Sequence, residues 1–303
     1  MLKFFGGQLS QSTHVRGIRT VPSHGDGSRA KVHMSVALGP SPIRRENYMT
    51  SKIIKYPHGF STRIGGVSEG IFESLNLGMN RGDDEDKVTK NWSIFLESCG
   101  IYTDSFVCGQ QVHENRVAIV TKENAHPAYK QPELIKADGY VTKDAGVPVA
   151  IFTADCTPLL LADEVGGVAG AIHCGWRSTV SDIEKNAIDA FITLGSKPEN
   201  IKASMGPAIG KCCFEVGQEV IDAAKNLIGA MPEELYSESI NQGKYMLDLQ
   251  GVIKIRLLQL GLKEENIEII NECTMCNTDK YWSHRGTAGI RGSQANVIMI
   301  PKR

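Results

Sequence analysis

The stretch PVAIFTADCTPLLLADEVGGVAGAIHCGWR (Pro148–Arg177) decides the fold. It contains three short apolar runs, PVAIFT, PLLLA and GVAGAIH, separated by glycines or charged residues. Runs of this length that are rich in Val, Ile and Leu are typical of buried strands. Cys156 stands just past the first run, and His173 closes the third. We therefore expect a rigid sheet that presents a thiol and an imidazole at adjacent strand ends.

Helical and strand patterns surround this stretch in an irregular order. Apolar residues recur every three or four positions in 86–99, 178–194, 218–231 and 248–262, which predicts helices. Strand-like runs occur at 116–120, 137–142, 201–207, 267–273 and 296–300. Because strands and helices do not alternate regularly, the sequence predicts α/β or α+β layers and not a doubly wound sheet.

Composition narrows the class of protein. With 303 residues, 41% hydrophobic and 22% charged, the chain can bury a sizeable core. The net charge of −1 creates no field that favours nucleic acid or an anionic membrane, and we expect neither as a partner. No apolar run approaches the roughly 20 residues of a membrane span. A chain this long needs no disulfides, so its eight cysteines favour a reduced compartment and mostly act as small buried groups.

Residues 1–47 differ from the domain-like sequence of residues 48–303. Residues 1–45 carry seven Lys or Arg against one acid, many Ser, and no run that suits a secretory signal. This composition fits an organelle transit peptide; a disordered tail or an alternative upstream start are the other interpretations. We expect a cytoplasmic protein, or a plastid or mitochondrial one if residues 1–47 act as a transit peptide.

One combination of side chains suits a metal site. His113, Cys156 and His173 offer two imidazoles and one thiolate, which are donors that zinc favours. Three protein ligands leave a fourth position for water, whose pKa zinc lowers toward about 7. Spacing alone does not show that three separate strand ends converge. The structural alternative is that Cys156 is a small buried residue and His173 a hydrogen-bonded core histidine.

Two other interpretations of the thiols stay open. In the first, Cys156 and His173 form a nucleophilic dyad that attacks a carbonyl, with a turn amide as the oxyanion donor. In the second, the CxxC pair Cys273–Cys276 binds a metal or is redox-active. The sequence disfavours this second interpretation, because no second CxxC exists and Cys212–Cys213 are adjacent. A multicopper centre is not supported either, since the eight histidines form no HxH pair.

Two arginines occupy positions that can receive an anion. Arg63 lies in the segment 60–68 next to a Gly-Gly turn, whose backbone amides are accessible. Arg177 directly precedes the predicted helix 178–194, whose N-terminal amides would favour phosphate near it.

Several motifs, in their order along the chain, resemble the YfiH family. They are GQQVH (109–113), ADGYVT (137–142), TADCTPLLLAD (153–163), HCGWR (173–177), GPAIGKCCFEVG (206–217), CTMC (273–276) and YWSHR (281–285). The resemblance covers nearly all of residues 50–300. The family was formerly labelled polyphenol oxidase or laccase and is associated with purine nucleoside phosphorylase and adenosine deaminase activity.

The resemblance implies a fold and a site. The fold is a single layered αββα sandwich domain of mixed sheets, spanning residues 48–303. His113, Cys156 and His173 would bind Zn²⁺, with copper as the alternative metal. Arg63 and Arg177 match family positions near the pocket, and we expect them to bind substrate or phosphate.

The resemblance also implies chemistry in one pocket. The expected reactions are zinc-dependent phosphorolysis of adenosine, inosine and methylthioadenosine, and deamination of adenosine to inosine by metal-activated water. Asp155 and Glu215 are candidates for the general acid. Glu114, Cys174, Ser178 and the residues 286–288 depart from the family pattern, which bears on substrate preference. The other function classes are a Cys–His hydrolase or deamidase and a non-catalytic metal-binding protein; the oligomeric state is left open.

Overall fold

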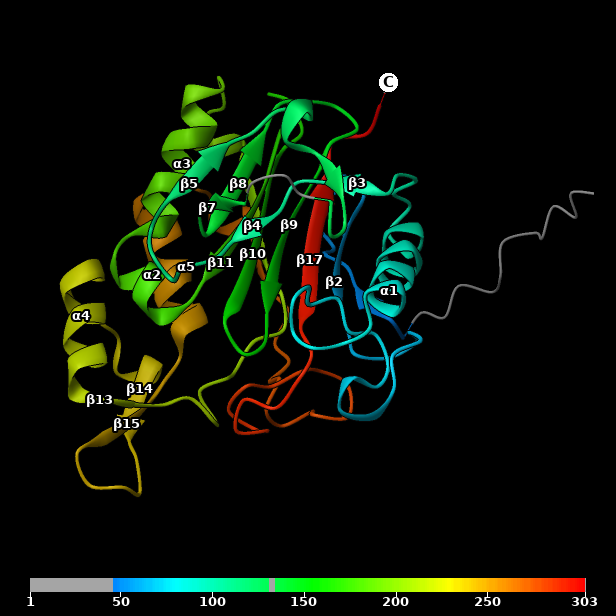
Figure 1. The fold of residues 1–303 in the computed structure, drawn as a ribbon. Coiled ribbons are helices and arrows are strands. Elements are labelled where there is room, and N and C mark those ends of the chain that lie inside the picture. Colours follow the sequence, from blue (N-terminus) through cyan, green and yellow to red (C-terminus); the bar gives the residue numbers. More distant parts are fainter. Residues whose placement is uncertain (1–45, 131–133, 303) are drawn as a thin grey trace, which may run out of the picture. The chain divides into compact units, whose positions relative to one another are not determined.

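The computed structural model describes residues 46–130 and 134–302 (Figure 1). Residues 1–45, which make up most of the expected N-terminal extension, lie outside the described residues, as do 131–133 and 303. Among the described helices, none combines the length and the apolar character needed to cross a bilayer.

A six-stranded mixed sheet contains two of the three apolar runs. Its order is β16 (Ile267–Ile269), β12 (Lys202–Met205), β10 (Thr157–Asp163), β11 (Val168–Cys174), β8 (Gly139–Thr142) and β5 (Val117–Ile119). The outer pairs β12–β16 and β5–β8 are parallel and the inner pairs antiparallel. The hairpin of β10 and β11 places Thr157 opposite Cys174, so the start of one strand and the end of the other share an edge.

The remaining apolar run belongs to a four-stranded antiparallel sheet. Its order is β1 (Tyr48–Met49), β2 (His58–Ser61), β17 (Gln294–Met299) and β9 (Pro148–Thr153). The last strand of the chain thus lies between an early strand and a central one. Because β17 follows β2 and β9 by more than 130 residues in the sequence, this sheet depends on long-range strand pairing.

The two sheets pack face to face, and their side chains explain the continuous apolar runs. Leu160 and Ala162 of β10 lie in the core between the sheets, together with Val149 and Ile151 of β9. Leu159 and Leu161, on the other face of β10, pack in the core under the helices. A strand that is buried on both faces needs apolar residues at successive positions.

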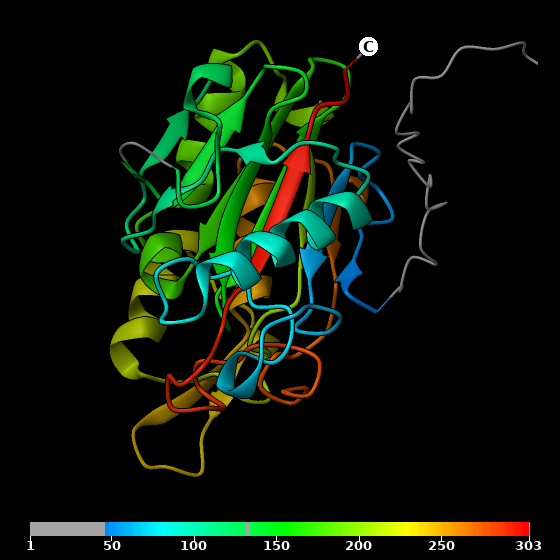
Figure 2. The same cartoon turned by 45° about the vertical axis from the view of Figure 1, so that its right-hand side comes forward.

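Helices cover the outer face of each sheet. The six-stranded sheet carries α2 (Trp176–Val180), α3 (Ile183–Thr193) and α5 (Leu249–Gln259), and α4 (Gln218–Ile228) packs against α2 and α5 in the same core. The four-stranded sheet carries α1 (Glu85–Ser98), which crosses its strands in Figure 2. On α1, Trp92 stacks on Phe106, with ring centroids 4.0 Å apart. This arrangement of layers confirms the expected αββα sandwich.

The structure differs from the sequence-based expectation in three places. The strand expected over 267–273 ends at Ile269. The single helix expected over 178–194 is divided into α2 and α3, because Asp182 adopts the left-handed conformation with φ of 66°. A small antiparallel sheet of β13 (Glu215–Gly217), β15 (Lys244–Leu247) and β14 (Tyr236–Glu238) was not expected. Its strands are too short to show an alternating pattern.

The other elements are short. Two further strand pairs are β3 (Ser105–Phe106) with β6 (His126–Pro127) and β4 (Gly109–Gln110) with β7 (Ile135–Lys136). Single 3₁₀ turns occur at Gly70–Phe72, Lys122–Asn124, Pro198–Asn200, Glu233–Leu235 and Glu264–Asn266.

Candidate metal centre and pocket

Three separate segments bring His113, Cys156 and His173 to one edge of the sheets. Cys156 lies in the turn between β9 and β10, and His173 is in register with Pro158 across the hairpin. His113 follows β4 in a loop and adopts a left-handed conformation, with φ of 60°. Their metal-ligating atoms all lie within 4.8 Å of one another. The two imidazole rings are nearly perpendicular, with centroids 4.8 Å apart.

Asp138, between β7 and β8, organises two of these side chains. Its carboxylate accepts hydrogen bonds of 3.0 Å from the backbone amides of Val112, His113 and Glu114, which holds the loop that carries His113. It also accepts a 2.8 Å hydrogen bond from Nδ1 of the buried His173. Burial opposes ionisation of Asp138, but these hydrogen bonds outweigh it and keep its pKa below the ordinary value. With its proton on Nδ1, His173 turns Nε2 toward Cys156.

The two imidazoles favour the thiolate form of Cys156. Burial alone would raise the pKa of this thiol, but attraction to His173 and a hydrogen bond with His113 outweigh it and lower the pKa to about 6. Burial acts on His173 in the opposite direction, and the neighbouring thiolate and Asp138 raise its pKa to about 9. Cys156 is therefore mostly deprotonated at neutral pH, which is the form that binds metals.

Gly175 leaves room beside the three donors. A Cβ atom built there would lie 3.2 Å from Cδ2 of His113 and 3.4 Å from Sγ of Cys156. The donor set of one thiolate and two imidazoles, with this space beside it, fits zinc better than magnesium or calcium, which prefer oxygen ligands. Among the described residues, this group is one of two that bring at least three candidate metal ligands together.

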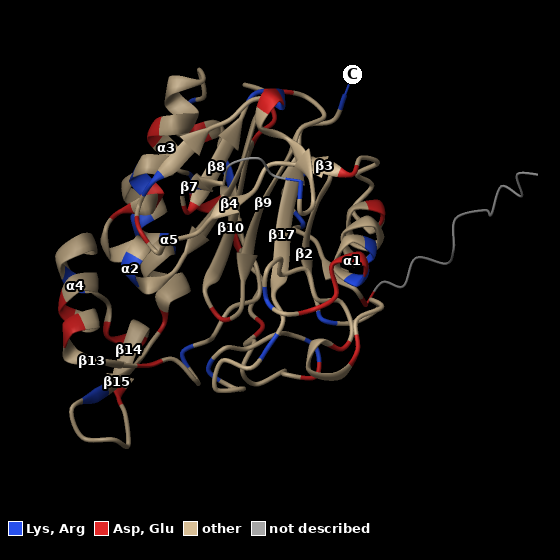
Figure 3. Ribbon diagram, viewed as in Figure 1, with Lys and Arg blue, Asp and Glu red and all other residues tan. Residues whose placement is uncertain are grey.

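The three side chains lie in a cleft of about 920 Å³. Its apolar lining includes Phe152, Trp176, Ile209 and Phe214. Four arginines also line it: Arg81, Arg177, Arg285 and Arg291. Figure 3 shows several Lys and Arg residues in the loops below the lower ends of the sheets. A cleft with apolar walls and clustered guanidinium groups suits a ligand that has both a ring system and an anionic group.

The two arginines expected from the sequence differ in their positions. Arg177 lines the cleft, and its guanidinium lies 4.2 Å from the ring centroid of Trp176. Arg63 is not among the residues that line the cleft. Its guanidinium donates hydrogen bonds to the backbone oxygens of Glu73 and Thr278 and stacks on Trp282. These contacts hold the Arg63 side chain within the fold.

Three arginines of the cleft were missed by sequence reasoning. Arg81 and Arg291 lie in loops without a regular pattern, and Arg285 was noted only as part of the YWSHR motif. Burial lowers the pKa of Arg291, and repulsion from Arg81 adds to this effect. The neighbouring positive charges of Arg81 and Arg291 favour the binding of an anion between them.

The two candidates for the general acid have other partners. Asp155 lines the cleft, but its carboxylate accepts hydrogen bonds of 2.6 Å from the Thr274 hydroxyl and from the Arg285 amide. Glu215 does not line the cleft; it accepts hydrogen bonds from Ser239 and Asn241, which lower its pKa.

Comparisons with known proteins agree with the fold. The sequence model of the family described as "Multi-copper polyphenol oxidoreductase laccase" matches residues 57–301. A "Purine nucleoside phosphorylase" of Deinococcus radiodurans is 35% identical over 82% of this chain and 90% of its own length. The "Adenosine deaminase RL5" of an unknown prokaryotic organism is 29% identical over 80% of this chain and 94% of its own. The crystal structure of YlmD from Geobacillus stearothermophilus superposes with a TM-score of 0.76 and 28% identity, covering 85% and 100% of the two chains.

Proposed function

Because the chain belongs to the YfiH family, described as multi-copper polyphenol oxidoreductase laccase, we propose that it is a purine nucleoside phosphorylase that also deaminates adenosine. One observation carries the proposal: two imidazoles and a thiolate meet in a cleft that four arginines line. The proposed substrates are adenosine, inosine and methylthioadenosine, with phosphate as the second substrate.

His113, Cys156 and His173 would hold a zinc ion. When bound, zinc supplies Lewis acidity toward water or a substrate heteroatom. The protein's own contribution is to prepare the donors: Asp138 fixes the proton of His173 on Nδ1, and the paired imidazoles keep Cys156 deprotonated. The match of one sulfur and two nitrogens to zinc, and not to several coppers, supports a hydrolytic or group-transfer reaction over an oxidase reaction.

The arginines would hold phosphate for phosphorolysis. Arg81 and Arg177 are exposed in the cleft, whereas Arg291 is half-buried and its Nε has no hydrogen-bond partner. Guanidinium groups bind phosphate oxygens through short, charge-assisted hydrogen bonds. A phosphate oxygen then bonds to C1′ of the nucleoside while the C1′–N9 bond breaks. The electron pair of that bond leaves with the base, which takes up a proton.

Aromatic side chains would position the purine. Phe152, Trp176 and Phe214 line the cleft that contains the metal ligands. Stacking on such rings recognises the flat face of any purine, which suits an enzyme that accepts more than one nucleoside. In the deamination reaction, water adds to C6 of adenosine and ammonia leaves, which gives inosine.

The lowered pKa of Cys156 also favours a second candidate, a thiol-dependent hydrolase in which Cys156 and His173 form the catalytic pair. The two candidates differ in their dependence on metal and on His113. The hydrolase needs neither of them, whereas the nucleoside enzyme needs both.

Product analysis by chromatography tests the proposal. Zinc-loaded protein should convert adenosine to adenine and inosine to hypoxanthine only with phosphate, and adenosine to inosine without it. Cys156→Ala and His113→Ala should lose these activities, whereas Arg116→Gln, an exposed arginine that does not line the cleft, should keep them. Absence of all products from loaded protein, or full activity of Cys156→Ala, would overturn the proposal.

A further inference from the structure

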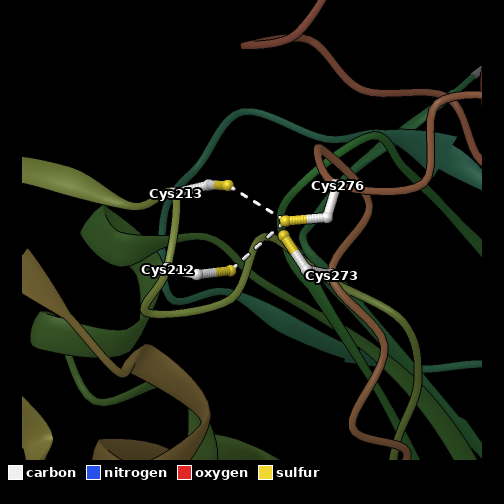
Figure 4. A group of neighbouring side chains, drawn as sticks. All are labelled: Cys212, Cys213, Cys273 and Cys276. Carbon is white, nitrogen blue, oxygen red and sulfur yellow. Dashed lines mark hydrogen bonds between the residues drawn. The ribbon is translucent and has the colours of Figure 1, made fainter.

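A second group of cysteines lies outside the cleft. Cys212 and Cys213 follow Gly210 in one loop, and Cys273 and Cys276 lie in another loop near the C-terminus. Figure 4 shows that the four sulfur atoms point toward one another. Sγ of Cys276 is 3.5 Å from Sγ of Cys212 and 3.4 Å from that of Cys213, and all four sulfurs lie within 4.8 Å.

These separations suit four thiolates around one ion. A zinc ion with Zn–S bonds of about 2.3 Å at the centre of a tetrahedron holds its sulfurs roughly 3.8 Å apart. A disulfide requires about 2.05 Å, and all four cysteines are free thiols. We propose that Cys212, Cys213, Cys273 and Cys276 form a closed four-thiolate site that binds a second zinc ion.

The backbone around the sulfurs supports this assignment. The amide of Gly210 donates a 3.3 Å hydrogen bond to Sγ of Cys273, an interaction that orients and stabilises a thiolate ligand. A Cβ atom on Gly210 would lie 3.3 Å from Cβ of Cys273 and 3.4 Å from Sγ of Cys212. Glycine at this position therefore lets the two loops approach closely enough for their sulfurs to share one ion.

The site joins two loops that form a wall of the cleft. Ile209 and Phe214, on either side of Cys212–Cys213, line the cleft. Thr274, next to Cys273, donates to the carboxylate of Asp155, the neighbour of Cys156. None of the four cysteines lines the cleft, and four protein ligands leave no open position for a substrate. The second zinc ion is therefore structural and acts on the cleft by fixing its wall.

Zinc stoichiometry tests the site without any assay of activity. Full-length protein is purified anaerobically with reductant, supplied with zinc and freed of loosely bound ions, and its zinc is counted by native mass spectrometry. We expect two ions in the wild type, one in Cys156→Ala/His113→Ala and one in Cys273→Ser/Cys276→Ser. The buried Cys108→Ala, which belongs to neither group, should keep both. A folded Cys156→Ala/His113→Ala protein without zinc would overturn the proposal.

Cobalt then identifies the ligands. In Cys156→Ala/His113→Ala, Co²⁺ should give the intense sulfur-to-metal charge-transfer bands of a tetrahedral four-thiolate site. These bands should disappear when Cys273→Ser/Cys276→Ser is added. A spectrum without thiolate bands would contradict the assignment. Since this experiment counts ligands and not products, it can fail while the proposed nucleoside chemistry holds, and the reverse is equally true.

X-ray absorption on the zinc-loaded wild type keeps the proposal testable if a variant does not fold. Sulfur neighbours at about 2.3 Å should outnumber imidazole nitrogens, averaged over the two ions. A spectrum dominated by nitrogen and oxygen neighbours would exclude the four-thiolate site. Recovery of a Cys212–Cys276 disulfide from the reduced anaerobic protein would exclude it as well.

Discussion

At the scale of single residues, Asp138 connects the backbone to the candidate metal centre. Its two carboxylate oxygens accept three backbone amides of the loop 112–114 and the Nδ1 proton of His173. The side chain is fully buried, and so is its hydrogen bond with His173, whereas its three hydrogen bonds with the loop amides are partly buried. One carboxylate thus sets the position of one candidate metal ligand and the proton position of another.

Asp138→Asn should weaken zinc binding at the centre by about 10- to 100-fold, because an amide cannot accept all four hydrogen bonds and its NH₂ group repels the loop amides. A competition titration with a zinc chelator measures the change. Asp163→Asn is the matched control, since Asp163 is also buried and accepts two backbone amides, from Val165 and Gly166, in a turn that does not line the cleft. Equal zinc affinity in wild type and Asp138→Asn would contradict the assigned role.

Glu184 of α3 gives a prediction about pH. It is fully buried, and its neighbours Thr179 and Cys174 only partly offset the effect of burial on its pKa. Burial raises its pKa from 4.5 to about 8. Between these values the native state keeps a proton that the unfolded state has lost, so this residue lowers the free energy of unfolding as the pH rises.

Glu184→Gln cannot titrate and should therefore gain stability relative to the wild type from pH 5 to pH 8, by on the order of a few kcal/mol. Urea unfolding at both pH values measures the difference. The exposed Glu219→Gln on α4 should leave the pH dependence unchanged. If wild type and Glu184→Gln keep a constant difference in stability across this range, Glu184 is not protonated in the native state.

At the scale of elements, the hairpin of β10 and β11 positions the centre. Its register places His173 opposite Pro158, two residues after Cys156. The strands are buried on both faces, so a shift by one residue would move every side chain into the opposite core, where its shape does not match its neighbours. The hairpin is followed by Gly175 at the N-cap of α2, and there the chain passes directly beside the candidate metal ligands His113 and Cys156.

Gly175→Ala tests this close approach. The backbone of Gly175 has φ of −74° and ψ of 161°, which alanine adopts without strain. Any effect must therefore come from the added methyl group, which would lie 3.2 Å from His113 and 3.4 Å from Cys156. We expect a loss of zinc affinity of about tenfold or more, measured by chelator competition, with an unchanged far-ultraviolet circular dichroism spectrum. Unchanged affinity would show that the ligands have room to move aside.

At the scale of the whole molecule, the cleft combines segments from most of the chain. Arg81 precedes α1, Arg177 lies in α2, and Arg285 and Arg291 lie between β16 and β17. The loops that carry them meet because β17 pairs with both β2 and β9. Arg81, Arg285 and Arg291 thus come from segments other than those of the candidate metal ligands, and we expect a substitution of one of these arginines to affect one of the two proposed reactions more than the other.

Arg81→Gln should raise the KM for phosphate in phosphorolysis by about tenfold or more, since a hydrogen bond to a charged group contributes about 1.5–3 kcal/mol. Deamination of adenosine needs no phosphate and should change little. Steady-state kinetics of both reactions measure the contrast, with Arg116→Gln as the control. An equal loss in both reactions would assign Arg81 to the nucleoside and not to phosphate.

Much of the fold and part of the site follow from the sequence. The apolar runs of 148–174 predict β9, β10 and β11, because burial on both faces requires uninterrupted apolar residues. His113, Cys156 and His173 were candidates from their donor types and from the family motifs, and the structure brings them within 4.8 Å. Helix periods predicted α1, α4 and α5 to within a few residues at each end.

Only the tertiary structure decided which distant residues meet. It added Arg81, Arg285 and Arg291 to the cleft and left Arg63 outside it. It also brings the adjacent pair Cys212–Cys213 next to the CxxC pair Cys273–Cys276, for which the sequence contains no second CxxC. The physical reason is that periodicity and donor type are local properties that the chain carries residue by residue. Proximity between loops depends on strand pairing and on packing of the two sheets, which leave no local pattern in the sequence.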